Sequence, residues 1–284
     1  MAGLVTGTLV VLARDVKKWV GRRGVFIVSI ITPLIWIAFF GKSMNIRGLI
    51  ASGVPQNLPP GLAKQIEEFY SEALKRAFGT SDYFTFFTAG MLAVFSVFQS
   101  MFSGVSVIFD KRLGYMDRLL VTPTPRPAIF LGKVGATLFR VTVLELLLFV
   151  AGVALGMKLK PGLSIIDLVA AWLVVMLLAL GLSSFYTTLS FYAENQEVVF
   201  AVGNLVNLPL MFTSSAIFPV NKMPHWLQVI AKANPVTYAS DLVRYHLVGY
   251  NIDSYALELG VLVAVSLLLF AAGLWLSVRW MTRR

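Results

Sequence analysis

The sequence of 284 residues contains no cysteine, only two histidines and few charged residues. Without cysteine, the chain forms no disulfide bond and offers no thiolate to a metal or a substrate. The two histidines, His225 and His246, stand far apart in a polar stretch, and we expect no metal site. Charged residues make up 13% of the chain, against roughly 25% in a typical soluble domain. This shortage of charge excludes an ordinary soluble domain.

A phosphate-binding loop is also absent from the sequence. The nearest match is Gly41–Ser43, but Trp36 stands where the motif requires a glycine, and the stretch ends an apolar run instead of following a strand. The sequence contains neither HExxH nor GxSxG, and its apolar runs carry no cluster of carboxylates. We therefore predict no catalytic residue, no metal site and no cofactor in this chain, which we expect not to be an enzyme.

Apolar residues, by contrast, make up 57% of the chain. They gather in runs close to the roughly 20 residues that a helix needs to cross a hydrocarbon core. The pattern predicts an all-α integral membrane protein with a single transmembrane domain over 1–284. We expect six membrane-spanning helices, at about 24–42, 84–109, 134–157, 166–190, 198–218 and 255–280.

The positions of Lys and Arg predict the orientation of the chain. Five basic residues precede the first span, and five more lie between the second and the third. Because basic residues concentrate on the cytoplasmic side of membrane proteins, we expect both termini in the cytoplasm. The acidic stretch 191–197 runs against this rule. The net charge of +10 is then expected to face anionic membrane lipid and not nucleic acid.

Two segments outside the spans have helical patterns. Residues 3–21 mix apolar residues with Arg14, Lys17 and Lys18, which is typical of a helix lying in the inner membrane interface. Residues 43–83 form a long outer loop. The middle of this loop begins at Pro-Gly, places acids ahead of bases and stops at a glycine, so it predicts one amphipathic helix.

A third segment, 219–250, is too polar to span a membrane and too apolar for a plain loop. Pro219, Pro224 and Pro235 divide it into short pieces. We predict two short re-entrant helices that dip into the outer leaflet before the last span. Irregular backbone of this kind persists in a membrane only where it packs on protein or lines a wet cavity.

Two charged residues fall within the third predicted span. Arg140 and Glu145 are five residues apart and therefore on different faces of a helix, which makes them a poor ion pair. Arg140 lies near the inner edge of the span and can extend to the interface. An ionisable residue inside a membrane is a functional candidate. We therefore consider Glu145 as part of a translocation pathway or gate.

Neutral polar residues within two other spans are further pathway candidates. They share one helix face in the second span and one in the fifth, as a pathway lining would. The residues are Ser96, Gln99, Ser103, Asn204 and Asn207. The alternative is helix packing, because small polar residues join membrane helices.

The charged segment 109–133, FDKRLGYMDRLLVTPTPRPAIFLGK, separates the second and third spans. Its first half is compatible with a helix, and the prolines of its second half end that helix. Apolar residues stand among the charges and predict that something covers one face. They are Leu113, Tyr115, Met116, Leu119 and Leu120. We interpret the segment as a helix that docks on a soluble partner. The alternative is an ordinary basic loop facing lipid.

In their order, these elements resemble the membrane subunit of type-2 ABC exporters, the ABC-2 permease family. Segment 109–133 is similar to that family's segment after the second span. Residues 207–244, NLPLMFTSSAIFPVNKMPHWLQVIAKANPVTYASDLVR, are similar to its signature across the end of the fifth span and the re-entrant helices. Residues 83–95, YFTFFTAGMLAVF, look like the drug-resistance branch. The resemblance covers nearly the whole chain.

The resemblance implies a division of work between subunits. A cytoplasmic coupling helix in loop 110–133 would dock on a separate ATPase subunit, which would bind ATP and Mg²⁺. Two copies of this chain would form a homodimer and enclose the pathway between their second and fifth spans, in the plasma membrane of a prokaryote. The coupling residues implied in this way are Asp110, Lys111, Arg112, Gly114, Tyr115, Asp117, Arg118, Leu119 and Leu120.

The function that the resemblance implies is export. We expect the chain to move an amphipathic drug or lipid-like substrate by alternating access, driven by ATP hydrolysis in the partner subunit. A permease for a lipid-linked polysaccharide or teichoic acid is the alternative within the family. A passive channel or a membrane scaffold is the alternative from another class.

Overall fold

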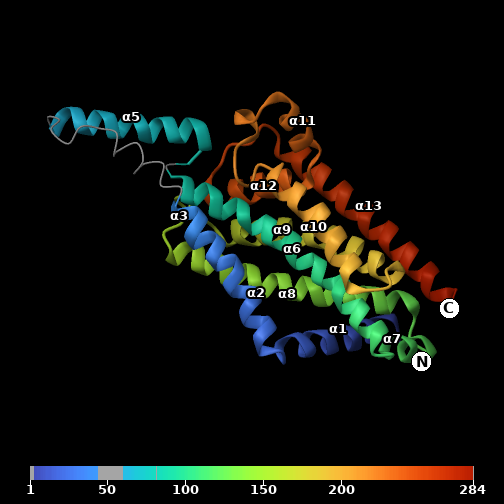
Figure 1. The fold of residues 1–284 in the computed structure, drawn as a ribbon. Coiled ribbons are helices and arrows are strands. Elements are labelled where there is room, and N and C mark those ends of the chain that lie inside the picture. The colour runs from blue at the N-terminus through green and yellow to red at the C-terminus, as the bar shows by residue number, and fades with distance from the viewer. Residues whose placement is uncertain (1–2, 44–59, 81, 284) are drawn as a thin grey trace.

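The computed structural model describes residues 3–43, 60–80 and 82–283, so that part of the predicted outer loop, 44–59, lies outside the described residues. Within the described ranges the regular secondary structure is helical, as the sequence predicts (Figure 1). A π-helical turn, Trp36–Phe40, joins α2 to α3. The α-helices are α1 (Leu4–Val20), α2 (Arg23–Ile35), α3 (Gly41–Ser43), α5 (Pro60–Phe78), α6 (Tyr83–Arg112), α7 (Tyr115–Val121), α8 (Arg126–Ala154), α9 (Ile165–Tyr192), α10 (Gln196–Phe212), α11 (His225–Ala233), α12 (Pro235–Val248) and α13 (Tyr255–Thr282).

Four of the described helices are long and apolar enough to cross a membrane, namely α6, α8, α9 and α13. The apolar stretches Phe26–Phe40 and Gln196–Phe212 are helical but shorter. They correspond to the first and fifth predicted spans. Four of the six predicted spans are therefore helices long and apolar enough to cross a membrane, and the other two are shorter helices.

The fifth predicted span, 198–218, ends early because polar contacts replace its last turns. Helix α10 stops at Phe212. The side-chain amide of Asn234, at the start of α12, donates hydrogen bonds of 2.7 Å to the carbonyl of Leu210 and 3.0 Å to the hydroxyl of Thr213. A helix end needs such partners for its last carbonyl groups, and here α12 supplies them.

The third predicted span begins earlier than expected. Helix α8 starts at Arg126 and not near residue 134. Pro125 is its N-cap residue and Pro127 lies in its first turn. In the first turn a proline interrupts no helical hydrogen bond, because the N–H groups there have no intrahelical acceptor. The prolines that end the preceding helix therefore also begin this one.

The predicted coupling helix over 110–120 is two elements and not one. Its first residues form the last turn of α6, and α7 starts afresh at Tyr115. Gly114 between them has a φ of 65°, in the left-handed region that favours glycine. The chain therefore turns sharply at the tip of α6.

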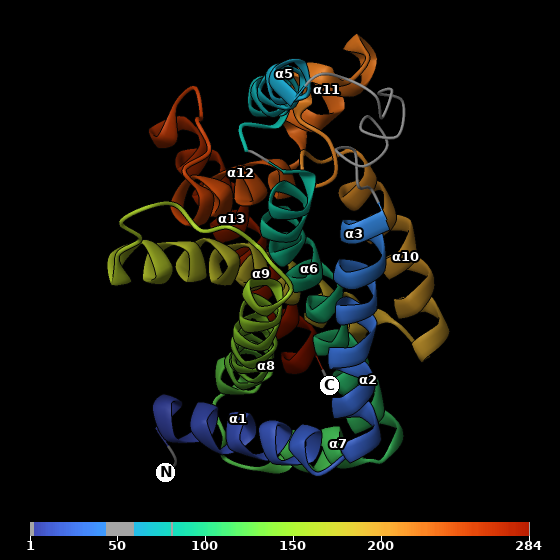
Figure 2. The ribbon, with the colours of Figure 1, turned by 90° about the vertical axis from the view of Figure 1, so that its left-hand side faces the viewer.

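Helix α6 lies at the centre of the bundle, against α8, α9 and α12 (Figures 1 and 2). Its approach to α9 is close at Gly104, where an added Cβ would lie 2.6 Å from the carbonyl oxygen of Tyr186. The hydroxyl of Ser103 donates to the carbonyl of Ser183 on the same helix at 3.0 Å. Membrane helices associate through small residues of this kind.

Shorter helices close the two ends of the bundle. Figure 2 shows α1 lying across one end with α7 beside it, which we call the α1 end, and α5 and α11 at the other. Figure 1 shows α5 extending away from the bundle. The helix predicted in the 3–21 segment and the helix predicted in the outer loop are both present.

The 219–250 segment forms the two short helices that its prolines predict, α11 and α12. Helix α12 packs on α6, α9 and α13, and most of its residues are buried. It is therefore a core element of the bundle, packed on protein as we expect of a re-entrant segment.

Candidate functional site

Charged residues from three helices meet in a buried network at the α1 end. Lys133 of α8 donates hydrogen bonds to Asp15 of α1, at 2.8 Å, and to Asp110 of α6. Arg14 of α1 approaches the same Asp110 with both terminal nitrogens, each at 2.8 Å. Asp110 and Lys133 are both buried. The network therefore ties α1, α6 and α8 together.

Further polar groups complete the network. Lys18 donates to Asp110 at 3.2 Å, and the hydroxyl of Ser106 donates to Asp15 at 2.9 Å. Buried charges are tolerated only when they are paired and hydrogen bonded. Burial alone would lower the pKa of Arg14, but the hydrogen bond and the negative charge of Asp110 outweigh it and raise that pKa above its ordinary value. Arg14 is therefore a permanent cation here.

Helix α7 is held against this network by its own first turn. The guanidinium carbon of Arg14 lies 3.3 Å from the ring centroid of Tyr115, the first residue of α7. Met116 and Leu119 pack into an apolar cluster with Val11 of α1 and Phe130 of α8. The chain itself therefore covers Met116 and Leu119, two of the apolar residues that the sequence predicts to be covered.

Three residues assigned to coupling are engaged within the chain. Asp110 lies in the ion network, and Leu119 lies in the apolar cluster. The ammonium of Lys111 donates to the carbonyl of Ala193, just beyond α9, at 2.6 Å. A cation at this place complements the carbonyl groups at a helix C-terminus. Asp110 and Leu119 are buried in this way, whereas Lys111 stays half-buried while it positions the turn.

The remaining coupling residues form the accessible surface of the turn. Gly114, Tyr115 and Leu120 are half-buried, and Arg112, Asp117 and Arg118 are exposed. Two apolar neighbours accompany them, Leu113 at 66% exposed and Val121 at 86%. We call the exposed set of Arg112, Leu113, Asp117, Arg118 and Val121 the α7 surface.

The polar face predicted to line a pathway in α6 is buried within the chain. Ser96 and Ser103 donate hydrogen bonds to backbone carbonyls, and Gln99 is also buried. The half-buried face of the same helix carries aromatic residues instead, including Phe98 and Phe102. The contacts of the two serines are therefore those expected for helix packing, the alternative to a pathway lining.

The two candidate asparagines of α10 have different surroundings. Asn204 is exposed, whereas Asn207 is buried and its side-chain carbonyl accepts a hydrogen bond from the hydroxyl of Tyr186. Asn207 thus joins α10 to α9. Only Asn204 is accessible to a substrate in a single copy of the chain.

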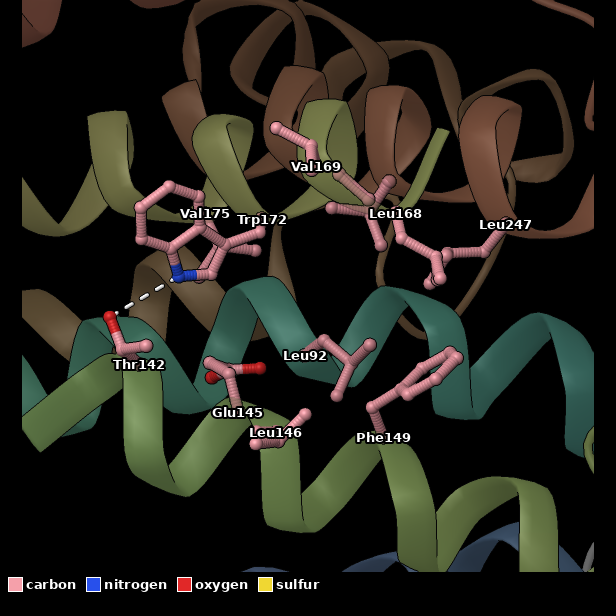
Figure 3. Close-up of a pocket in the computed structure, with 12 residues that line it drawn as sticks. Leu92, Thr142, Glu145, Leu146, Phe149, Leu168, Val169, Trp172, Val175 and Leu247 are labelled. Carbon is pink, nitrogen blue, oxygen red and sulfur yellow. Dashed lines mark hydrogen bonds between the residues drawn. The ribbon is translucent and has the colours of Figure 1, made fainter. Parts of the chain in front are cut away.

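Glu145 is buried in α8, with only 7% of its surface exposed. Neither carboxylate oxygen has a hydrogen-bond partner among the described residues. The side chain lies on the wall of a cavity between α6, α8, α9 and α12 (Figure 3). Arg140, on another face of the same helix, is directed toward Trp19 and Phe102. The two charges are separate, as their spacing predicts.

Sequence reasoning missed a second buried cation, Arg244 of α12. Its guanidinium donates to the carbonyls of Phe86 at 3.0 Å and Ala216 at 2.7 Å, and to the carboxylate of Asp241 at 2.9 Å. Gly90 of α6 leaves the room for it, because an added Cβ would lie 2.1 Å from one terminal nitrogen. The sequence did contain a signal for this ion pair, because Arg244 follows Asp241 by three residues within a segment divided by prolines.

The fold and the site together define a multispan membrane protein with a short accessible helix clamped to one end of its bundle. The pattern of the ABC-2 type transporter family matches residues 6–248, and the chain belongs to this family. The family is one of transporter permeases, so the chain is a transport subunit and not itself an enzyme.

Two relatives illustrate the family. The chain is 29% identical over 241 residues to the transport permease designated ycf38 of Cyanophora paradoxa. The aligned region covers 84% of this chain and 73% of that permease. It is 27% identical over 165 residues to the daunorubicin resistance ABC transporter permease protein DrrB1 of Streptomyces coeruleorubidus, covering 58% of each. The resemblance to ABC-2 permeases stated from the sequence motifs is confirmed.

Proposed function

We propose that this chain is the membrane-spanning half of an ATP-driven exporter, and that the α7 surface docks a separate ATPase subunit. The observation that carries the proposal is the position of α7. It stands at the tip of α6, the central helix, and its inner side is fixed by Tyr115 on Arg14 and by the apolar cluster. A force on the α7 surface would therefore reach α1, α6 and α8 together.

The chemistry of the α7 surface fits a protein partner. It combines two cations and one anion with two exposed apolar side chains, Leu113 and Val121. Apolar residues within a charged rim are typical of specific protein interfaces. In this arrangement ATP binding closes the ATPase subunits, and their movement shifts the permease between states that open to opposite sides of the membrane.

A homodimer is part of the same proposal. The exposed faces of α2 and α10 are apolar, with Val28, Ile31, Leu205 and Phe212 among the exposed residues. Figure 2 shows these two helices on the same side of the bundle. A second copy seated there would enclose a pathway next to the half-buried aromatic face of α6.

The cargo that we propose is an amphipathic drug or lipid-like molecule, in the plasma membrane of a prokaryote with both termini in the cytoplasm. The printed name of the Streptomyces relative, daunorubicin resistance, supports a drug. A lipid-linked polysaccharide or teichoic acid is the second candidate.

The docking proposal is tested by co-purification with the ATPase subunit of the same transport system. The double variant Arg118→Glu, Val121→Asp changes two exposed side chains and leaves the apolar cluster intact. We expect it to lose at least ~10-fold in affinity, as interface hot spots do. Arg279→Glu, an exposed charge reversal in α13, is the matched control and should bind normally. Equal binding by both variants would place docking elsewhere.

A further inference from the structure

The cavity beside Glu145 has apolar walls and opens on the surface of the bundle (Figure 3). Its volume is about 260 Å³. The deep side is formed by buried residues, including Leu92 of α6 and Leu247 of α12. The mouth is formed by exposed residues of α8 and α9, Leu146, Val169 and Trp172. Because α8 and α9 are long enough to span a membrane, the mouth faces lipid.

Glu145 is the one ionisable side chain among the residues that line this cavity. The other polar lining residue, Thr142, has its hydroxyl engaged, since it donates to the carbonyl of Leu138 at 3.0 Å and accepts from the indole of Trp172 at 3.2 Å. In Figure 3 the carboxyl group of Glu145 projects between α8 and α6 with no hydrogen bond to the residues drawn. The cavity therefore carries a single uncommitted polar group.

Among the residues that the structure describes, no cation pairs with this carboxyl group. Arg140 has its guanidinium 5.6 Å from the ring centroid of Trp19 and 6.0 Å from that of Phe102, toward the α1 end. A carboxylate without a partner in apolar surroundings is costly, and a buried acceptor left unpaired costs free energy even when it is neutral. An ionisable group inside a membrane-spanning helix is therefore a candidate for binding a ligand.

We propose that the cavity binds the protonated amine of a lipophilic ligand that enters from the membrane. The ammonium group donates hydrogen bonds to the oxygens of Glu145, and the apolar walls hold the body of the ligand. The rings of Trp172 and Phe149 also line the cavity, and the faces of aromatic rings attract cations. The volume admits a small cage-like amine, or the amine end of a larger molecule whose remainder lies among lipid chains.

The amine site rests on the proposed exporter function, for which it names a class of ligand. Amine binding is measured on the purified permease alone, so its result does not depend on the ATPase. Failure of the ATPase to bind would leave the amine site unaffected, and failure of the amine to bind would leave the docking proposal unaffected.

The probe is 1-aminoadamantane, compared with 1-hydroxyadamantane, which has the same cage and no charge. Binding is read from the rise in the unfolding temperature of the detergent-solubilised chain with ligand concentration. We expect the amine to stabilise the chain at concentrations at least ~10-fold lower than the alcohol, which corresponds to about 1.4 kcal/mol. Equal stabilisation by amine and alcohol would overturn the proposal.

The variant Glu145→Gln keeps the shape of the side chain and removes its charge. We expect it to fold, because it removes an unpaired buried carboxyl group, and to lose the preference for the amine. Glu258→Gln, a carboxyl of α13 that does not line the cavity, is the matched control and should keep the preference. Amine binding that survives in Glu145→Gln overturns the proposal.

A second variant guards against a folding defect in the first. Val169→Trp places a large side chain at the exposed mouth and leaves Glu145 unchanged. We expect it to weaken binding of both adamantanes, because it closes the entrance to the cavity. Unchanged binding of the amine would mean that the ligand is held elsewhere.

Discussion

Arg14 and Asp110, 96 residues apart in the chain, are joined by two hydrogen bonds of 2.8 Å each. This pairing is the geometry in which a guanidinium and a carboxylate match best. Asp110 is fully buried, whereas Arg14 keeps part of its side chain in contact with the surroundings. The pair therefore anchors α1 to the tip of α6.

Asp110→Asn removes one of the two carboxylates that face Arg14, Lys18 and Lys133. We expect the free energy of unfolding to fall by roughly 3–5 kcal/mol, because buried cations lose their partner. The measurement is denaturant unfolding of the detergent-solubilised chain. Asp117→Asn, on the exposed side of α7, is the control and should change it by less than about 0.5 kcal/mol. Equal changes would mean that the network does not stabilise the fold.

Arg14→Lys keeps the positive charge and loses the paired hydrogen bonds and the planar contact with Tyr115. We expect α7 to separate more often from α1, because an ammonium group cannot reproduce either contact. Hydrogen exchange of the amides in 115–121 should become faster. Arg118→Lys, an exposed change on α7, should leave the exchange rates as they are. Protection that is unchanged in Arg14→Lys would contradict the proposed clamp.

Gly90→Ala tests the packing of the Arg244 guanidinium against α6, toward the end of the bundle opposite the α1 end. The new Cβ would lie 2.1 Å from a terminal nitrogen of Arg244 and 2.8 Å from the carbonyl oxygen of Ala216. We expect a loss of about 3 kcal/mol, because the guanidinium must give up buried hydrogen bonds. Gly260→Ala, in α13 with open space around it, should stabilise the helix by about 0.5–1 kcal/mol. Thermal unfolding of both variants gives the comparison.

Gly114→Ala tests the turn between α6 and α7. The position has open space, so the change acts only through the backbone, which has a φ of 65°. We expect a loss of about 1–2 kcal/mol, the usual penalty for a left-handed residue with a Cβ. Gly24→Ala, in the helical first turn of α2 with open space around it, should be neutral or stabilising. Equal stabilities for the two variants would mean that the turn relaxes freely.

Much of the fold could be predicted from the sequence. Runs of apolar residues locate the long helices, and prolines locate the short pieces of the 219–250 segment, because both signals are local. Boundaries set by distant groups could not be predicted. Helix α10 ends where Asn234 reaches Leu210, 24 positions earlier in the chain, and no local pattern announces that contact.

The same distinction between local and distant signals holds for the candidate site. Glu145 could be recognised as a charge within an apolar run, and the segment after the second span as a short charged helix ended by prolines. The cavity could not be foreseen, because its walls come from four helices. Nor could the burial of Lys133, whose partner Asp15 lies 118 positions away. Charge alone does not reveal whether a side chain will face a partner or its own chain.

The same separation sets an order of assembly. Asp15 is made early, and beyond its neighbour Arg14 it gains a counter-ion only when Lys133, 118 residues later, has been synthesised. Asp110, the other carboxylate of the network, also arrives after α1 is complete. Until then α1 carries its charges without these partners and has no defined packing position on the bundle. Its docking is therefore a late step of biogenesis, and a chain interrupted before α8 would leave α1 undocked.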